Sequence, residues 1–207
     1  AEKYADGFSE KNRFLSWSMA KSFTQALVGI LVKQGKMDIH KKIDLKEWGQ
    51  DQRANITIEN LMHMNSGLEW NENYGNLSDV TVMLHKQTDF AKFTIQKPSV
   101  VSPDSLWVYN SGATNVVSYL IRKTIANDAA YYAFPREVLF NPIGMRSAVF
   151  EVDPSGTFVG SSYIWATARD YARFGLLYLK RGNWFGDQIL STSWIDRTRQ
   201  PASSNQQ

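Results

Sequence analysis

Ser18 and Lys21 have the spacing of a nucleophile and its base. Ser18-Met19-Ala20-Lys21 is the only Ser-x-x-Lys in the 207-residue chain, and it stands at the start of the most apolar helical stretch. Residues three apart share one face of a helix, so the Lys21 amine can reach the Ser18 hydroxyl. An uncharged amine there would accept the serine proton, and the oxygen could then attack an amide or ester carbonyl.

The local sequence favours an uncharged Lys21. The positions three and four residues away on either side hold no acid; they are Trp17, Ser18, Thr24 and Gln25. Burial disfavours a charged lysine, and the positive end of the helix dipole disfavours a cation, so both lower the pKa of the amine. The alternative is that Lys21 extends into solvent and Ser18 only caps the helix.

A second candidate segment, Trp107 to Gly112, looks like a strand that leads directly into a helix. Such a junction presents side chains at the edge of a cleft. Tyr109 could share the role of base, because a neighbouring ammonium would stabilise its phenolate. Ser111 could hydrogen-bond a substrate or Lys21. The alternative is a packed tyrosine whose hydroxyl bonds the backbone.

Other chemistries lack their residues. The chain has no Cys, and its three histidines, His40, His63 and His85, form neither His-x-His nor His-Glu-x-x-His, so no metal site is expected. We interpret His63 as structural. There is no Gly-x-Ser-x-Gly elbow and no glycine-rich phosphate loop, so the sequence predicts neither a Ser-His-Asp hydrolase nor a nucleotide cofactor. We expect no cofactor.

Composition limits the partners. A hydrophobic fraction of 43% is typical of a globular protein. The net charge is only +3 and no Lys/Arg run occurs, so we expect no nucleic-acid binding. No apolar run reaches the roughly 18 residues of a membrane span.

The periodicity predicts a mostly helical chain with few, short strands, which make a poor sheet for the helices to cover. No repeat or linker divides it, so we expect a single domain over residues 1–207. Residues 69–77 read as a surface loop. The expected helices run from Ser18 to about Gln34, from Thr57 through Asn65, from the capping residue Asp79 through His85, over 112–126, over 131–140, and from Thr167 to Lys180. Asp89 is expected to cap a further short helix. The expected strands are 3–8, 13–16, 147–152 and 157–163.

Five segments in one order resemble the serine β-lactamase and penicillin-binding-protein superfamily, and the class C β-lactamase-like branch in particular, which also holds esterases, D-aminopeptidases and amide-oligomer hydrolases. Leu15 to Ser22 resembles the nucleophile motif, and His63 to Leu68 resembles a His-Thr-Ser-Gly-Leu segment. Trp107 to Gly112 resembles the tyrosine motif, and Leu139 to Met145 a Leu-Phe-x-Pro-Leu-Gly-Met stretch. Ala166 to Phe174 resembles a further family block.

The resemblance implies an α/β (α+β) fold of the β-lactamase/transpeptidase type, in which a helical subdomain adjoins helices on an antiparallel sheet. This chain would be mostly helical and lack much of that sheet. The resemblance also implies that Ser18 is the acylated nucleophile, that Lys21 is its general base and that Tyr109 relays protons to and from the leaving group. The substrate would be a small amide or ester.

Two departures from the family pattern stand out. Ser111 occupies the Asn position of the family's Tyr-x-Asn, which leaves its substrate contact open. The third motif, a Lys-Thr-Gly or His-x-Gly strand that supplies the second oxyanion-hole N–H, is absent and would follow residue 207. The resemblance therefore implies that the chain is incomplete at both ends.

The function that this reading favours is cleavage of an amide or ester through a serine acyl-enzyme. One alternative is a penicillin-binding or sensor-type domain that acylates without efficient turnover. Another is a non-catalytic interaction domain that uses the aromatic-rich loop 69–74. β-Lactams, D-amino-acid peptides, short esters and amide oligomers all remain open as substrates, as does the oligomeric state. Export in a bacterium is favoured over a cytoplasmic location.

Overall fold

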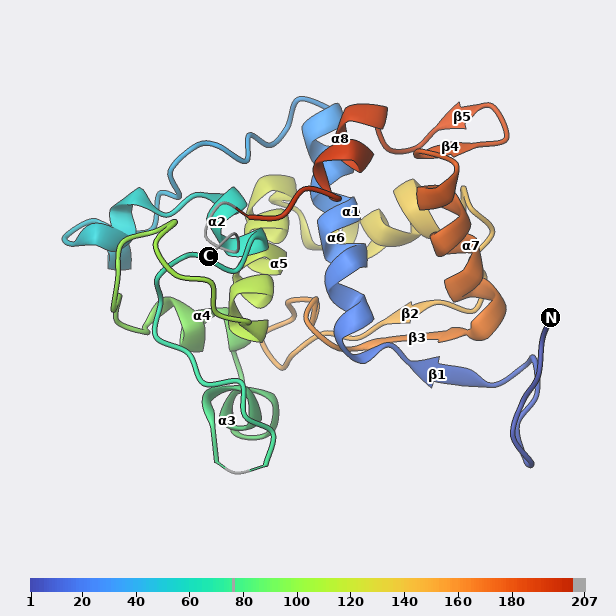
Figure 1. Ribbon diagram of the computed structural model, residues 1–207, viewed down its shortest axis with the longest axis horizontal. Helices are drawn as coiled ribbons and strands as arrows, with labels where there is room; N and C mark the ends of the chain where they lie inside the picture. The colour runs from blue at the N-terminus through green and yellow to red at the C-terminus, as the bar shows by residue number, and fades with distance from the viewer. Residues whose placement is uncertain (76, 203–207) are drawn as a thin grey trace.

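Helix α1 (Ala20–Lys33) lies in the middle of the molecule, with helices around it and a small sheet beside its N-terminal end (Figure 1). The computed structural model describes residues 1–75 and 77–202. None of the helices in these ranges is long and apolar enough to cross a membrane. The other α-helices are α2 (Ile58–Met62), α3 (Asp79–Lys86), α4 (Phe90–Ile95), α5 (Ser111–Ile125), α6 (Asp128–Pro135), α7 (Ala168–Leu179) and α8 (Thr192–Arg197).

The strands are short. A three-stranded antiparallel sheet has the order β1 (Arg13–Leu15), β3 (Ile164–Thr167), β2 (Val149–Phe150). Phe14 lies opposite Ala166, and Val149 opposite Trp165. A separate hairpin pairs β4 (Asn183–Trp184) with β5 (Asp187–Gln188). The remaining turns are the 3₁₀ helices η1 (Trp17–Met19), η2 (Lys46–Trp48) and η3 (Gln52–Asn55), and the π-helix η4 (Arg136–Phe140).

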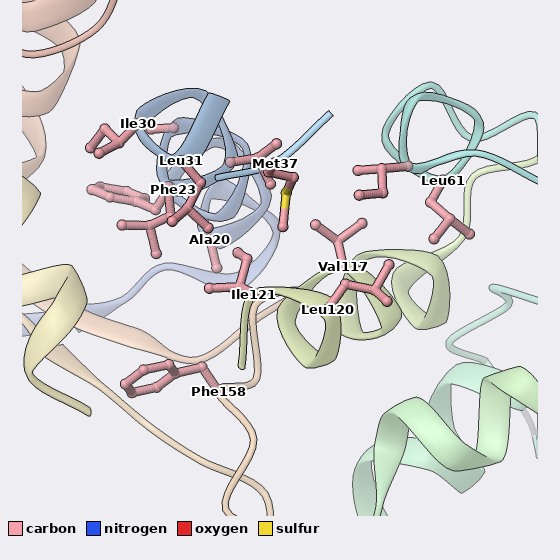
Figure 2. Close-up of a cluster of buried hydrophobic side chains, with 14 of the residues drawn as sticks. Ala20, Phe23, Ile30, Leu31, Met37, Leu61, Val117, Leu120, Ile121 and Phe158 are labelled. Atoms are coloured by element: carbon pink, nitrogen blue, oxygen red, sulfur yellow. The ribbon is translucent and has the colours of Figure 1, made fainter. Parts of the chain in front are cut away.

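The main core forms where α1 and α5 face each other. Figure 2 shows Phe23 and Leu31 of α1 and Val117 and Ile121 of α5 in one cluster of buried side chains. All four side chains are buried, and the Phe23 ring stacks on Phe174 of α7 with the centroids 3.8 Å apart. Burying such a side chain stabilises the fold by about 1.5–3 kcal/mol, so the cluster holds α1 between its neighbouring helices. A second buried cluster joins Trp70 to α3 and α4.

Most predicted elements are confirmed. Asp89 caps α4 by accepting a hydrogen bond from the N–H of Lys92 at 2.8 Å, and Thr167 caps α7. The cap of α3 was wrong: Ser78, not Asp79, accepts from the N–H of Thr81. The helix predicted over 131–140 begins at Asp128 and changes to the π-helix η4 after Pro135.

Two predicted strands were wrong. Residues 3–8 contain a turn, in which Gly7 has a φ of 83° and the N–H of Phe8 bonds the carbonyl of Ala5. Residues 157–163 form a loop, in which the N–H groups of Ser162 and Tyr163 both donate to the carbonyl of Val159 at 3.1 Å and the N–H of Phe158 donates to the Tyr131 hydroxyl at 2.8 Å. The strand that pairs with β1 is β3. The prediction of a single domain over residues 1–207 stays a prediction.

Candidate active site

The turn from β1 into α1 presents Ser18. Ser16 is buried; its N–H donates to the carbonyl of Ile164 at 2.7 Å, and its hydroxyl accepts from the N–H of Ile164 at 3.1 Å. Trp17 then adopts a φ of 45°, a left-handed conformation that is strained for a bulky side chain. Ser18 follows in η1, exposed at the N-terminal end of α1. The two bonds of Ser16 to Ile164 and the left-handed conformation of Trp17 therefore fix the course of the backbone through the turn.

Lys21 lies at the centre of the predicted site. Its Nζ donates to Ser18 Oγ at 3.2 Å, to Ser111 Oγ at 2.9 Å and to the carbonyl of Ser161 at 3.0 Å. It also lies 4.9 Å from the centroid of the Tyr109 ring. The structure thus brings together all four residues that the sequence singled out, and Lys21 does not extend into solvent.

Burial lowers the pKa of Lys21 to about 8, while the negative charge of Glu72 acts in the opposite direction. With a pKa near 8, about one amine in ten is neutral at pH 7. The sequence predicted this direction from burial, and the structure gives the same cause.

Ser111 and Tyr109 reach Lys21 through the start of α5. The N–H of Val108 bonds the carbonyl of Met64 at 2.8 Å, and the Asn110 side chain caps α5 by accepting from the N–H of Ala113. Ser111, the first residue of α5, is fully buried. The sequence predicted Lys21 or a substrate as the partner of Ser111. The bond to Lys21 is observed, and contact between Ser111 and a substrate stays a prediction.

Glu72 is a site residue that the sequence analysis missed. Its carboxylate accepts from the N–H of Ser111 at 2.9 Å, from the hydroxyl of Tyr74 at 2.9 Å, and from the Ser111 hydroxyl and the Trp70 indole. The spacing Trp-x-Glu-x-Tyr is the available signal, because alternate residues of an extended segment lie on one side. The loop 69–77 therefore contributes to the site.

The carbonyl of Ser161 is the second missed group. Asn115 on α5 holds Ser161 in place by two hydrogen bonds: the N–H of Ser161 donates to Asn115 Oδ1, and Asn115 Nδ2 donates to Ser161 Oγ, each at 3.2 Å. Both residues are buried. A buried asparagine on the face of α5 that packs inward was the signal for this contact.

A groove of about 450 Å³ adjoins Lys21 on the side of α2 and α8. Its lining includes Gln25, His63, Tyr178 and Arg197. Burial lowers the pKa of His63, against the effect of Asp104. No group of three or more His, Asp or Glu side chains gathers as potential metal ligands within residues 1–75 and 77–202.

Comparison with known families decides the family. The family model described as Beta-lactamase matches residues 2–206. The chain belongs to the β-lactamase family. The relatives place it in the class C-like branch, as the sequence motifs indicated, and the β-lactamase/transpeptidase fold is confirmed.

The relatives include hydrolases of small amides. The 6-aminohexanoate-dimer hydrolase of Paenarthrobacter ureafaciens is 22% identical over 95% of this chain and 53% of its own length. A solved Bacillus anthracis structure, provisionally assigned the same activity, is 25% identical with a TM-score of 0.78, over 95% of this chain and 55% of that one. A D-stereospecific amidohydrolase from Streptomyces sp. has the same fold, with 13% identity and a TM-score of 0.69, over 94% of this chain and 67% of that one.

The chain spans about half the length of the Paenarthrobacter ureafaciens enzyme. It is a β-lactamase-family chain with a hydrolase fold.

Proposed function

We propose that this β-lactamase-family chain carries the acylating residues of a serine hydrolase that cleaves a small amide or ester. The observation that carries the proposal is the position of Lys21 Nζ, 3.2 Å from Ser18 Oγ, where partial burial lowers the pKa of the amine to about 8. An amine with this pKa can accept a proton near neutral pH. The names of the relatives favour an amide substrate over an ester.

The first step is formation of the acyl-enzyme. Ser18 Oγ gives its proton to neutral Lys21 and bonds the substrate carbonyl carbon, whose oxygen becomes an oxyanion. The N–H of Ser18 at the start of α1 is one donor for that oxyanion, and a donor of this kind contributes roughly 3–4 kcal/mol. Lys21 then returns the proton to the leaving amine or alcohol, with Tyr109 as the relay next to it.

The second step is deacylation. A water molecule attacks the ester of Ser18, gives a proton to Lys21, and the acid product leaves as the Ser18 hydroxyl forms again. The groove that Lys21 lines could hold part of a substrate, although Ser18, Tyr109 and Ser111 are not among its lining residues. The proposal requires no metal ion or cofactor.

The test uses the full-length protein that contains this chain. A fluorophosphonate probe is added, and the labelled peptide is identified by mass spectrometry. We expect the label on Ser18, no label in Ser18→Ala, and turnover of p-nitrophenyl esters or a small amide. Label elsewhere contradicts the proposal. A burst of one product per protein without turnover identifies the acylating sensor type instead.

A further inference from the structure

The carboxylate of Glu72 determines where the Ser111 proton points. Each oxygen of Glu72 accepts two hydrogen bonds: Oε2 from the N–H of Ser111 and the Trp70 indole, Oε1 from the hydroxyls of Tyr74 and Ser111. An ionised carboxylate can only accept, so the Ser111 hydroxyl must donate its single proton to Glu72. Towards Lys21, Ser111 Oγ is then left as an acceptor.

This constraint passes on to Lys21. A neutral amine has two N–H donors and one lone pair. The carbonyl of Ser161 can only accept, and Ser111 Oγ accepts as well, so these two partners take both N–H groups. The ammonium form donates its third N–H to Ser18 Oγ at 3.2 Å, and in the neutral amine the lone pair takes the place of that N–H and is directed at the same oxygen.

We propose that Glu72 is a positioning residue: by holding the Ser111 proton it keeps the lone pair of Lys21 directed at the Ser18 hydroxyl. The inference rests on the proposed function, because it takes Ser18 as the nucleophile. Glu72 lies behind Ser111 and acts on Lys21 through it. In this arrangement a residue of loop 69–77 determines the direction of the Ser111 proton and, through it, the direction of the Lys21 lone pair.

The negative charge of Glu72 has a second, opposing effect on Lys21. It raises the pKa of the amine against the larger effect of burial, and so reduces the neutral fraction. The other titratable groups near Lys21 are Tyr109, whose ring lies beside the amine, and the groove residues His63, Tyr178, Arg197 and Arg199. Loss of the charge and loss of the proton direction therefore have different signatures in a pH profile.

Glu72→Gln separates the two effects. The N–H groups of Ser111 and Trp70 need an acceptor, so the amide oxygen of Gln takes the place of Oε2 and the amide NH₂ faces Ser111 Oγ. Ser111 must then accept from Gln, and its own proton turns towards the lone pair of Lys21. We expect the rate of Ser18 labelling at its plateau to fall on the order of 100-fold, as for a misplaced catalytic group.

The same variant shifts the acid limb of the profile. Without the charge of Glu72 the pKa of Lys21 falls further, so the neutral amine persists at lower pH. A lower plateau together with an acid limb at lower pH is the expected result. Loss of the charge alone would move the limb and leave the plateau unchanged, so the plateau is the readout of the proton direction. A merely structural role would also lower the plateau, but its loss would add to that of Ser111→Ala in the double variant.

The experiment measures the second-order rate of fluorophosphonate labelling against pH in the full-length protein. The variants are Glu72→Gln, Ser111→Ala and the double variant, and the matched control is Glu69→Gln, an exposed acid of the same loop. Ser111→Ala removes the contact to Lys21, but it also leaves no hydroxyl proton that could point at the lone pair of Lys21. We therefore expect only about a tenfold loss. The double variant should equal Ser111→Ala and react faster than Glu72→Gln, while the control keeps the original rate.

Additive losses in the double variant or an unchanged plateau in Glu72→Gln would each overturn the inference. If Glu72→Gln does not fold, Ser111→Ala alone decides, and an unchanged rate in that variant overturns it. If the unmodified protein is never labelled at Ser18, the proposed function fails, and that result is distinct from every result above.

Discussion

Lys21 has two sides that are built differently. On the side of Ser18 and Ser161 the contacts fix the course of the backbone: Ser16 bonds Ile164 through its N–H and its hydroxyl, Trp17 adopts a left-handed turn, and Asn115 holds Ser161. On the side of Ser111 and Glu72 the neighbours are held by side chains from a loop, where the indole of Trp70 and the hydroxyl of Tyr74 fix the carboxylate.

The difference separates two tasks. The backbone side fixes where the nucleophile stands, and its disruption should appear first in the stability of the fold. The side-chain side fixes the charge and direction of the amine, and its disruption should appear first in the rate and its pH dependence. The predictions below test that division.

The largest effect is expected for Lys21→Ala, which removes the group that both sides position. General-base catalysis contributes on the order of 10²–10⁴-fold, so turnover of a p-nitrophenyl ester should fall by that factor. Lys33→Ala, at the exposed end of the same helix, is the control. Retention of full turnover in Lys21→Ala would end the assignment of Lys21 as the base.

Ser16→Ala tests the backbone side. The variant leaves the buried N–H of Ile164 without its acceptor and removes the donor to the carbonyl of Ser162. An unsatisfied buried group costs about 1–3 kcal/mol, so the free energy of unfolding measured with urea should fall by that amount. The acid limb of the labelling profile should not move. A moved limb with unchanged stability would reverse the division.

The pH profile of the unmodified protein tests the side-chain side. Burial depresses the pKa of Lys21 to about 8, and the reactive form is the neutral amine. The labelling rate should therefore rise with pH, level off above about 8, and fall about tenfold for each pH unit well below it. A rate that is flat across this range would show that Lys21 is not the titrating base.

The site was predictable where its geometry is local. The spacing of Ser18 and Lys21 lies within one helical turn, and the strand-to-helix junction pointed to Tyr109 and Ser111. The direction of the Lys21 pKa also followed, because burial is the larger cause. The family motifs added the type of fold, whereas the few, short strands followed from the periodicity.

The rest depended on contacts between distant segments. Helical spacing identifies only the neighbours of Lys21 on its own helix, whereas Glu72 comes from a loop about 50 residues further along the chain. The Ser161 carbonyl is a backbone group, so only its side-chain partner Asn115 gave a signal for it. The strand predicted over 157–163 failed because its N–H groups bond the Val159 carbonyl and the Tyr131 hydroxyl, and β-propensity cannot anticipate such competing contacts.

Trp70→Phe gives the smallest and most selective test of the division. The phenyl ring keeps much of the packing against Gly112 and Phe93 but removes the indole donor to Glu72. A hydrogen bond to a charged group contributes about 1.5–3 kcal/mol, and because three donors to the carboxylate remain, we expect only a several-fold loss in labelling rate. Phe93→Leu is the matched control, since it loosens the same packing without removing a donor to Glu72, although it also removes the ring next to the Lys97 ammonium. If both variants slow labelling equally, packing and not the hold on Glu72 sets the rate, and the side-chain side of Lys21 has no separate task.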